Sequence, residues 1–205
     1  MSAKIRLEGV YKIFGSQPRG RALALAKAGS SKDDVQTLTD HVVGLADVNF
    51  EVAEGEIFVV MGLSGSGKST AIRTVNKLHE ITDGHVWVDD VDVQTLSGRA
   101  LQELRREKMG MVFQHFALFP HRSVIDNVGY GLEVQGVDRD TRNKKALEAL
   151  SLVGLEPYAS SMPSQLSGGM QQRVGLARAL AGDPDILLMD EAFSARSEEH
   201  TSELQ

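Results

Sequence analysis

The sequence predicts an α/β fold with a helical insertion, and three observations carry this prediction. Two short apolar runs, Ile57–Met61 and Ile186–Met189, are typical of strands covered on both faces. A glycine-rich loop and then a helical pattern follow the first run. A longer helical pattern, residues 114–166, separates the two runs. A chain of 205 residues is long enough for one good core and too short for two full domains.

The sequence of the N-terminal third predicts strands with one helix between them. Residues 4–14 mix alternation with β-branched side chains and indicate a strand, and residues 15–20 indicate a turn. Ser31 followed three residues later by Asp34 is a helix-starting pattern, so we expect a short helix over Lys32–Thr39. Residues 47–52 alternate like a half-buried strand.

The remaining elements alternate between helix and strand. We expect a helix from Lys68 to about Leu78, a strand and turn over residues 85–93, a charged helix over Arg99–Lys108 and a strand over Met109–Phe113. Apolar residues then recur at helical spacing through the insertion, and a further helix begins at Gly168.

Composition narrows the classes of function. Hydrophobic residues make up 41% of the chain and charged residues 24%, as in ordinary globular proteins. The formal net charge of -6 argues against a nucleic-acid binder, which needs basic surface. There is no cysteine, so thiolate metal sites are excluded. No apolar stretch approaches the roughly 18 residues of a membrane helix, and the start does not resemble a signal peptide, so we expect any membrane association to need a partner.

The segment from Gly62 to Thr70 matches the pattern G-x-x-x-x-G-K-[ST]. Glycines let consecutive backbone amides point toward phosphate oxygens, and the following helix adds free amides and a favourable dipole. A chance match in a turn is the alternative, but the position between an apolar strand and a helix is the required context. The predicted nucleotide-binding residues are Gly62, Ser64, Gly65, Ser66, Gly67, Lys68, Ser69 and Thr70, with Lys68 on the phosphates and Ser69 on Mg²⁺.

Asp190 and Glu191 follow the second apolar run. Carboxylates at the C-terminal end of a buried strand lie where ligands of α/β sheets bind. We expect Asp190 to hold Mg²⁺ and Glu191 to orient an attacking water. Taken alone, a strand that ends in a solvated turn explains the pair equally well.

Ser167, Gly168 and Gly169 precede the helix predicted after residue 166. Free amides and a hydroxyl at a helix start can bind an anion. On capping preferences alone, an ordinary helix N-cap is the better explanation.

The segment Leu166–Arg173, LSGGMQQR, resembles the signature motif of the ABC ATPase family, and it lies shortly before the apolar run that ends in Asp190. The resemblance covers nearly the whole chain to Ala195. It implies a P-loop NTPase core of the RecA type with a small antiparallel β subdomain and an inserted helical subdomain at about 115–168. It also implies that ATP and Mg²⁺ are the cofactors, and that Gln114 is a catalytic glutamine that contacts Mg²⁺. Phe14 stands where the family stacks an aromatic ring on adenine. A core phenylalanine is an equal alternative, and Tyr11 is a weaker candidate for the stack.

The chain more narrowly resembles the ATP-binding subunits of glycine betaine/proline (quaternary amine) uptake systems. The supporting features are VYKIFG, a long insert between Phe14 and Val48, GEIFVVMGLSGSGKST and MVFQHFALFPHRSVIDNV. This resemblance implies an importer motor at the cytoplasmic face of the membrane. It would work as a homodimer with a membrane permease that contacts the surface around Gln114–His121, and a solute-binding protein would deliver the solute. The alternatives are an ABC ATPase of an amino-acid importer and a soluble, nucleic-acid-associated ABC ATPase.

Residues 196–205 depart from the family and resemble the translation of a sequencing-adapter oligonucleotide. We expect a non-native tail after a domain of residues 1–195 that is incomplete at its C-terminus. The family's D-loop and switch histidine would then be missing, and His200 would not replace that histidine. Both apolar runs would expose unpaired strand edges. On this basis we expect the chain alone to bind nucleotide weakly and to hydrolyse it negligibly.

Overall fold

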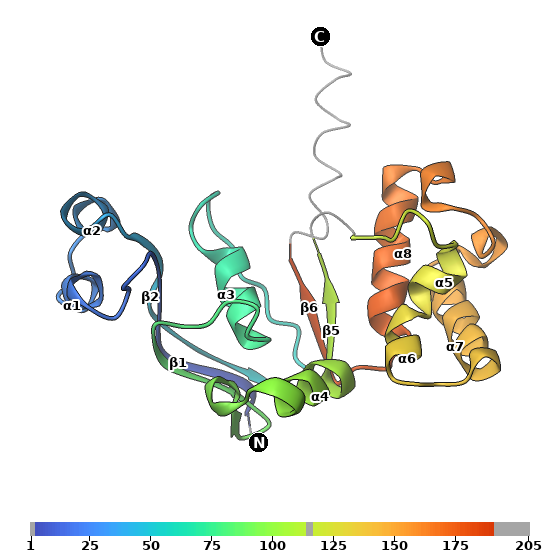
Figure 1. The fold of residues 1–205 in the computed structure, drawn as a ribbon, viewed down its shortest axis with the longest axis horizontal. Coiled ribbons are helices and arrows are strands. Elements are labelled where there is room, and N and C mark those ends of the chain that lie inside the picture. Colours follow the sequence, from blue (N-terminus) through green and yellow to red (C-terminus); the bar gives the residue numbers. More distant parts are fainter. Residues whose placement is uncertain (1–2, 114–116, 191–205) are drawn as a thin grey trace, which may run out of the picture. The chain divides into compact units, whose positions relative to one another are not determined.

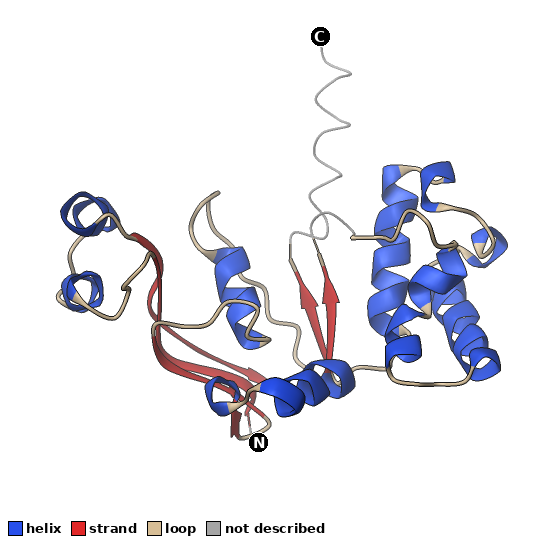
Figure 2. Ribbon diagram, viewed as in Figure 1, coloured by secondary structure: helices blue, strands red, loops and turns tan. Residues whose placement is uncertain are grey.

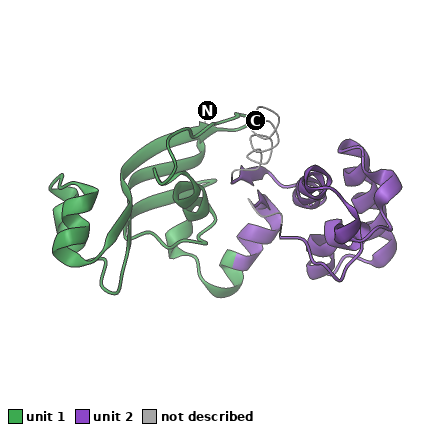
Figure 3. Cartoon of the chain, turned by 90° about the horizontal axis from the view of Figure 1, so that it is seen from above, with its two compact units in different colours: residues 1–101 green, residues 102–205 purple. Residues whose placement is uncertain are grey.

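A computed structural model describes residues 3–113 and 117–190 of the chain (Figure 1). The chain divides into two compact units, residues 1–101 and residues 102–205 (Figure 3). The division falls inside a single helix, α4 (Gly98–Lys108). Each unit has its own sheet and its own helices, so the two are described in turn.

The first unit is built on an antiparallel sheet. Its order is β2 (Val42–Ala53), β1 (Ala3–Phe14), β3 (Asp83–Val88) and β4 (Val91–Asp92). The strand β1 confirms the strand predicted over residues 4–14, whereas β2 begins five residues earlier than the predicted 47–52. The sheet corresponds to the predicted small antiparallel β subdomain.

Two helices lie between β1 and β2. The helix α2 (Lys32–Thr39) has the predicted bounds, and the backbone N–H of Asp34 donates to Ser31 Oγ at 3.0 Å. The Asp34 carboxylate accepts from the Ser31 hydroxyl at 2.7 Å, which completes a capped first turn. The helix α1 (Arg21–Lys27) was not predicted. Its buried residues Ala22 and Ala26 pack with Ile13, Val35 and Val43 in a small core.

The predicted strand Ile57–Met61 is wrong. Residues 56–63 have no regular structure, and Figure 2 draws the connection from β2 to α3 (Lys68–Val75) as a loop. Ile57 is 91% exposed and Met61 is 86% exposed. A strand exists only where its backbone groups pair with a neighbour. Within the described ranges no strand pairs with this run, so its apolar side chains face solvent.

The helix α3 ends three residues before the predicted Leu78. Lys77 adopts a positive φ of 54°, and the backbone N–H of Leu78 donates to Asn76 Oδ1 at 3.1 Å. A side-chain turn of this kind competes with the helical hydrogen bonds and ends the helix. A short helix, η1 (Val93–Thr95), follows β4 and completes the first unit before α4.

The second unit contains a parallel strand pair. The strand β5 (Met109–Val112) pairs with β6 (Ile186–Met189) in the register Met109↔Ile186 to Val112↔Met189. Both strands were predicted, β6 with the same bounds. Parallel strands need a long crossover, and the intervening helices supply it.

The crossover contains helices within the predicted insertion and then the helix predicted from Gly168. It comprises α5 (Val124–Val128), α6 (Tyr130–Val134), α7 (Arg139–Leu152), the short helices η2 (Glu156–Tyr158) and η3 (Pro163–Gln165), and α8 (Gly168–Leu180). Figure 2 shows these helices gathered together, and their buried residues form one core that includes Val128, Leu150 and Val174. No helix in the described part of the chain is both long and apolar enough to cross a membrane.

Candidate nucleotide site

The glycine-rich loop from Gly62 to Gly67 leads directly into α3. Gly65 has a φ of 76° and Gly67 a φ of 100°, conformations that favour glycine. The backbone N–H of Ser66 donates to the carbonyl oxygen of Leu63 at 3.2 Å and tightens the turn. The Lys68 ammonium donates to the carbonyl oxygens of Gly62 and Leu63, both at 2.8 Å. The Lys68 ammonium is therefore bound directly to the backbone of the loop.

Gly67 lies against β2. A Cβ atom at residue 67 would stand 2.4 Å from the carbonyl oxygen of Gly44, which no real contact allows. The position therefore needs glycine for two independent reasons, its positive φ and this close backbone approach. The contact fixes the start of α3 against the antiparallel sheet.

Phe14 lies beside the same part of β2. Its ring atom Cε2 is 2.7 Å from the point where a Cβ on Gly44 would stand. The ring also meets His79 edge to face, with centroids 5.5 Å apart, and the Lys12 ammonium lies 4.7 Å from the ring centroid. Burial lowers the pKa of the Lys12 ammonium. Phe14 is thus brought next to the phosphate loop through one residue, Gly44.

Phe14 is 38% exposed, so the alternative of a core phenylalanine is wrong. Its backbone is nevertheless well fixed. The buried Thr82 hydroxyl oxygen accepts from the backbone N–H of Ile13 at 2.9 Å. Tyr11 packs against the core under α1 and α2, with the Lys27 ammonium 5.7 Å from its ring centroid. Of the two aromatic candidates, Phe14 is the one that lies near the loop with part of its ring exposed.

Asp190 follows β6 and is completely buried. Its backbone N–H donates to the carbonyl oxygen of Val112 at 3.0 Å, which continues the β5–β6 pairing by one residue. A carboxylate at this end of a parallel pair stands where α/β proteins bind ligands. The two other predicted catalytic residues, Gln114 and Glu191, lie outside the described residues.

Ser167 caps α8. Its hydroxyl oxygen accepts from the backbone N–H of Met170 at 3.3 Å, so the N-cap expected from capping preferences is present. Gly168 and Gly169 have nothing within 4 Å of an added Cβ, and all three residues are exposed. Gln171 fixes the preceding turn by donating to the carbonyl oxygens of Pro163 and Leu166 at 3.0 and 3.2 Å. Hydrogen bonds hold the helix start, and the space around its two glycines is open.

The predicted site residues therefore fall into two groups. The phosphate loop and Phe14 are brought together in the first unit, and Asp190 and Ser167 belong to the second. Sequence reasoning missed Gly44, which touches both Phe14 and the loop. An isolated glycine inside a strand often marks a close backbone approach, but the predicted strand began at residue 47, whereas β2 begins at Val42.

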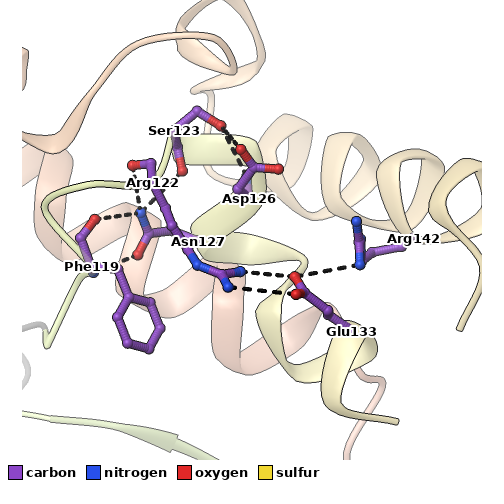
Figure 4. A network of polar contacts seen from close by, with 7 residues as sticks. All are labelled: Phe119, Arg122, Ser123, Asp126, Asn127, Glu133 and Arg142. Atoms are coloured by element: carbon purple, nitrogen blue, oxygen red, sulfur yellow. Dashed lines mark hydrogen bonds and ion pairs between the residues drawn. The ribbon is translucent and has the colours of Figure 1, made fainter. Parts of the chain in front are cut away.

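A polar network organises residues 119–133 and reaches α7 (Figure 4). Asn127 is fully buried, and its amide oxygen accepts from the backbone N–H of Phe119 at 2.7 Å. Its amide nitrogen donates to the carbonyl oxygens of Phe119, Arg122 and Ser123 at 3.1, 3.0 and 3.0 Å. One side chain thus holds the turn from Phe119 to Ser123, whose first three residues belong to the surface Gln114–His121 predicted to receive a permease.

The Arg122 guanidinium leaves this turn and reaches α6. It donates to Glu133 at 2.8 Å and lies 5.0 Å from the Tyr130 ring centroid. Arg142 of α7 lies 3.4 Å from the same carboxylate (Figure 4). The hydrogen bond from Arg122 holds the pKa of Glu133 below its usual value and raises that of Arg122. The network ties the turn to two helices.

The donor groups fit a magnesium nucleotide. Mg²⁺ commonly binds one or two carboxylates together with phosphate oxygens rather than a cage made only of protein groups. In the first unit, Ser69 in the first turn of α3 offers a hydroxyl, and in the second unit the buried Asp190 offers a carboxylate. The Gly65–Lys68 turn offers amides at a helix start, where phosphate is favoured.

Comparison with known proteins places this geometry in a family. The sequence profile described as ABC transporter matches residues 45–194. The chain is 56% identical to the glycine betaine transport ATP-binding protein OpuAA of Bacillus subtilis, over 94% of this chain and 46% of that protein. It is 53% identical to the glycine betaine/proline betaine transport system ATP-binding protein ProV of Escherichia coli, over 95% of this chain and 48% of that protein. The chain therefore spans about half the length of these relatives.

A solved structure has the same fold. The ATP-binding cassette MJ0796 bound to ADP and Pi in a post-hydrolysis state, described as dimeric, is 35% identical with a TM-score of 0.75. The comparison covers 92% of this chain and 74% of that one. Both the predicted fold class and the narrower resemblance to glycine betaine systems are confirmed. The chain belongs to the ABC transporter family.

Proposed function

We propose that this chain binds MgATP and supplies the ATP-hydrolysing motor of an importer for a quaternary amine solute of the glycine betaine/proline type. The observation that carries the proposal is the phosphate loop. Its glycines adopt positive φ, it opens α3, and the Lys68 ammonium stands over its backbone. This arrangement suits a polyphosphate.

Each residue has a proposed role. Amides of Gly65, Ser66 and Gly67 would cradle the phosphates. Lys68 would exchange a carbonyl contact for phosphate oxygens and would neutralise their charge. Phe14 would stack on the adenine.

Hydrolysis would use residues of both groups. Ser69 and Asp190 would hold Mg²⁺, which offsets phosphate charge when it is bound. Gln114 and Glu191 would orient the attacking water. Ser167, Gly168 and Gly169 would offer a second helix start to a nucleotide held by another copy of the chain. The fold relative described as dimeric supports a homodimer.

The names of the relatives support the proposed partners. Their names describe ATP-binding proteins of transport systems, which supports a permease at the cytoplasmic face and, beyond it, a solute-binding protein. An amino-acid importer is the second candidate, because a methionine import ATP-binding protein of Symbiobacterium thermophilum is 53% identical over 75% of this chain. Reconstitution of the full-length protein with its permease separates the two. We expect ATP turnover to rise with glycine betaine and its binding protein, and methionine-stimulated turnover would contradict this.

The phosphate-loop role is tested by Lys68→Ala. Hydrogen bonds to charged groups contribute about 1.5–3 kcal/mol, so we expect MgATP to bind at least about tenfold more weakly in isothermal titration. The control is Lys144→Ala, which removes an exposed lysine from α7. Equal affinities for the two variants would refute the role of Lys68.

A further inference from the structure

We propose that Gly44 is a positioning residue for nucleotide recognition, because it seats the Phe14 ring at a fixed distance from the phosphate loop. The inference rests on the proposed function, in which the loop binds the phosphates and Phe14 stacks on the base. It goes beyond that function by assigning the link between the two contacts to a residue that touches no nucleotide.

The Phe14 ring occupies the space beside Gly44 that a side chain at residue 44 would need. A Cβ at residue 44 would lie 2.7 Å from Cε2 and 3.4 Å from Cδ2 of the ring. The first distance is well inside van der Waals contact, so any side chain would force the ring to move. Phe14 can move, because its ring is the free end of a side chain and is 38% exposed. Only glycine therefore permits the observed ring position.

The backbone of Gly44 also lies close to the phosphate loop. The carbonyl oxygen of Gly44 lies 2.4 Å from the Cβ position of Gly67, the residue before α3. Both partners of this contact are backbone, so the approach has little freedom. The space beside Gly44 where a Cβ would stand thus adjoins the base side of the proposed site, and its carbonyl oxygen adjoins the phosphate side.

Backbone pairing and hydrogen bonds hold the chain around these contacts. Phe14 pairs with Val42 in the β1–β2 ladder, and Ile13 is held by the buried hydroxyl of Thr82. The edge-to-face contact with His79 limits the ring on another side. Because the backbone at both ends is fixed, the ring position depends on the space that Gly44 leaves. A base stacked on Phe14 would then lie at a set distance from phosphates in the loop.

The experiment compares ATP with inorganic tripolyphosphate, which has no base. Base–aromatic stacking changes affinity by about tenfold or more when it is lost. We expect Gly44→Ala to weaken MgATP binding about tenfold and to leave tripolyphosphate binding within about twofold of wild type. The control is Gly20→Ala, where the added Cβ would meet only Gln17 O at 3.6 Å, and we expect it to change neither affinity.

A double-mutant cycle separates positioning from a general structural effect. With the ring removed by Phe14→Ala, the remaining close atom at a Gly44→Ala Cβ is Lys12 O at 3.4 Å, an ordinary contact. We therefore expect Gly44→Ala to have no further effect on ATP affinity in that background. If Gly44→Ala alone does not fold, recovery of folding in the double variant supports the steric contact, and failure of both variants overturns the proposal.

The remaining outcomes are decisive. Equal weakening of ATP and tripolyphosphate would overturn the inference, because Gly44 would then act through Gly67 and the loop. An unchanged ATP affinity in Gly44→Ala would also overturn it. In both cases the wild-type chain still binds ATP, so the proposed function stands. A wild-type chain that binds neither ligand overturns the proposed function and the inference with it.

Discussion

Asn127 is the side chain whose removal should damage the second unit most clearly. Its amide makes four hydrogen bonds to the backbone of residues 119–123 and is completely buried (Figure 4). Truncation in Asn127→Ala leaves the Phe119 N–H without its partner, at a cost of about 1–3 kcal/mol. The loss of three hydrogen bonds to carbonyl oxygens and the cavity left by the side chain lower the stability further. We expect a total loss of about 3 kcal/mol, a large part of the 5–15 kcal/mol that stabilises a typical domain.

The assay is denaturant unfolding followed by circular dichroism, with Asn143→Ala as the matched control. Asn143 lies on α7 in the same unit and is only partly buried. Alanine suits a helix better than asparagine, so we expect no loss there. Asn127→Asp keeps an acceptor for the Phe119 N–H but cannot donate to the carbonyl oxygens, so it should not restore stability. An Asn127→Ala variant within about 0.5 kcal/mol of the Asn143→Ala control would refute the reasoning.

Two further outcomes are expected. Gly67→Ala should lower the Tm by more than Gly65→Ala. Both glycines have a positive φ, but only at Gly67 do backbone atoms occupy the space that a Cβ would need. Equal losses of Tm would contradict this. The pKa of Glu133 is held down by the hydrogen bond from Arg122, so its stabilising contribution is present above the usual value of 4.5 and is lost as pH falls through the lowered pKa. The Tm difference between wild type and Glu133→Gln should therefore shrink from pH 7 to pH 3, and a constant difference would refute the pairing.

Local patterns predicted most elements of the fold, but not the partner that a strand requires. The runs Ile57–Met61 and Ile186–Met189 carry the same apolar signal. The second forms β6 because β5 pairs with it, whereas the first has no paired strand within the described residues. Side-chain pattern reports a preference for burial, and backbone pairing depends on residues distant in sequence. The prediction failed at that step.

The candidate site likewise combines features that the local sequence predicts with features that depend on distant residues. The loop motif predicted both the start of α3 and the residues around Lys68, because the pattern itself specifies a turn before a helix. The exposure of Phe14 could not be predicted from its own segment, where a core position was equally plausible. The position of its ring depends on the space beside Gly44, which is thirty residues away in the sequence. Motifs specify local chemistry, and packing between distant segments decides which side chains reach it.

The central claim is that the loop of residues 62–70 binds the phosphates of ATP. Hydrogen exchange measured by mass spectrometry, with and without MgATP, tests it most directly because it reports on backbone amides segment by segment. We expect slower exchange at Gly65–Lys68 and in the segment that contains Phe14, and we expect Lys68→Ala to need at least about tenfold more MgATP for the same slowing. Unchanged exchange at Gly65–Lys68 when MgATP is bound would contradict the claim.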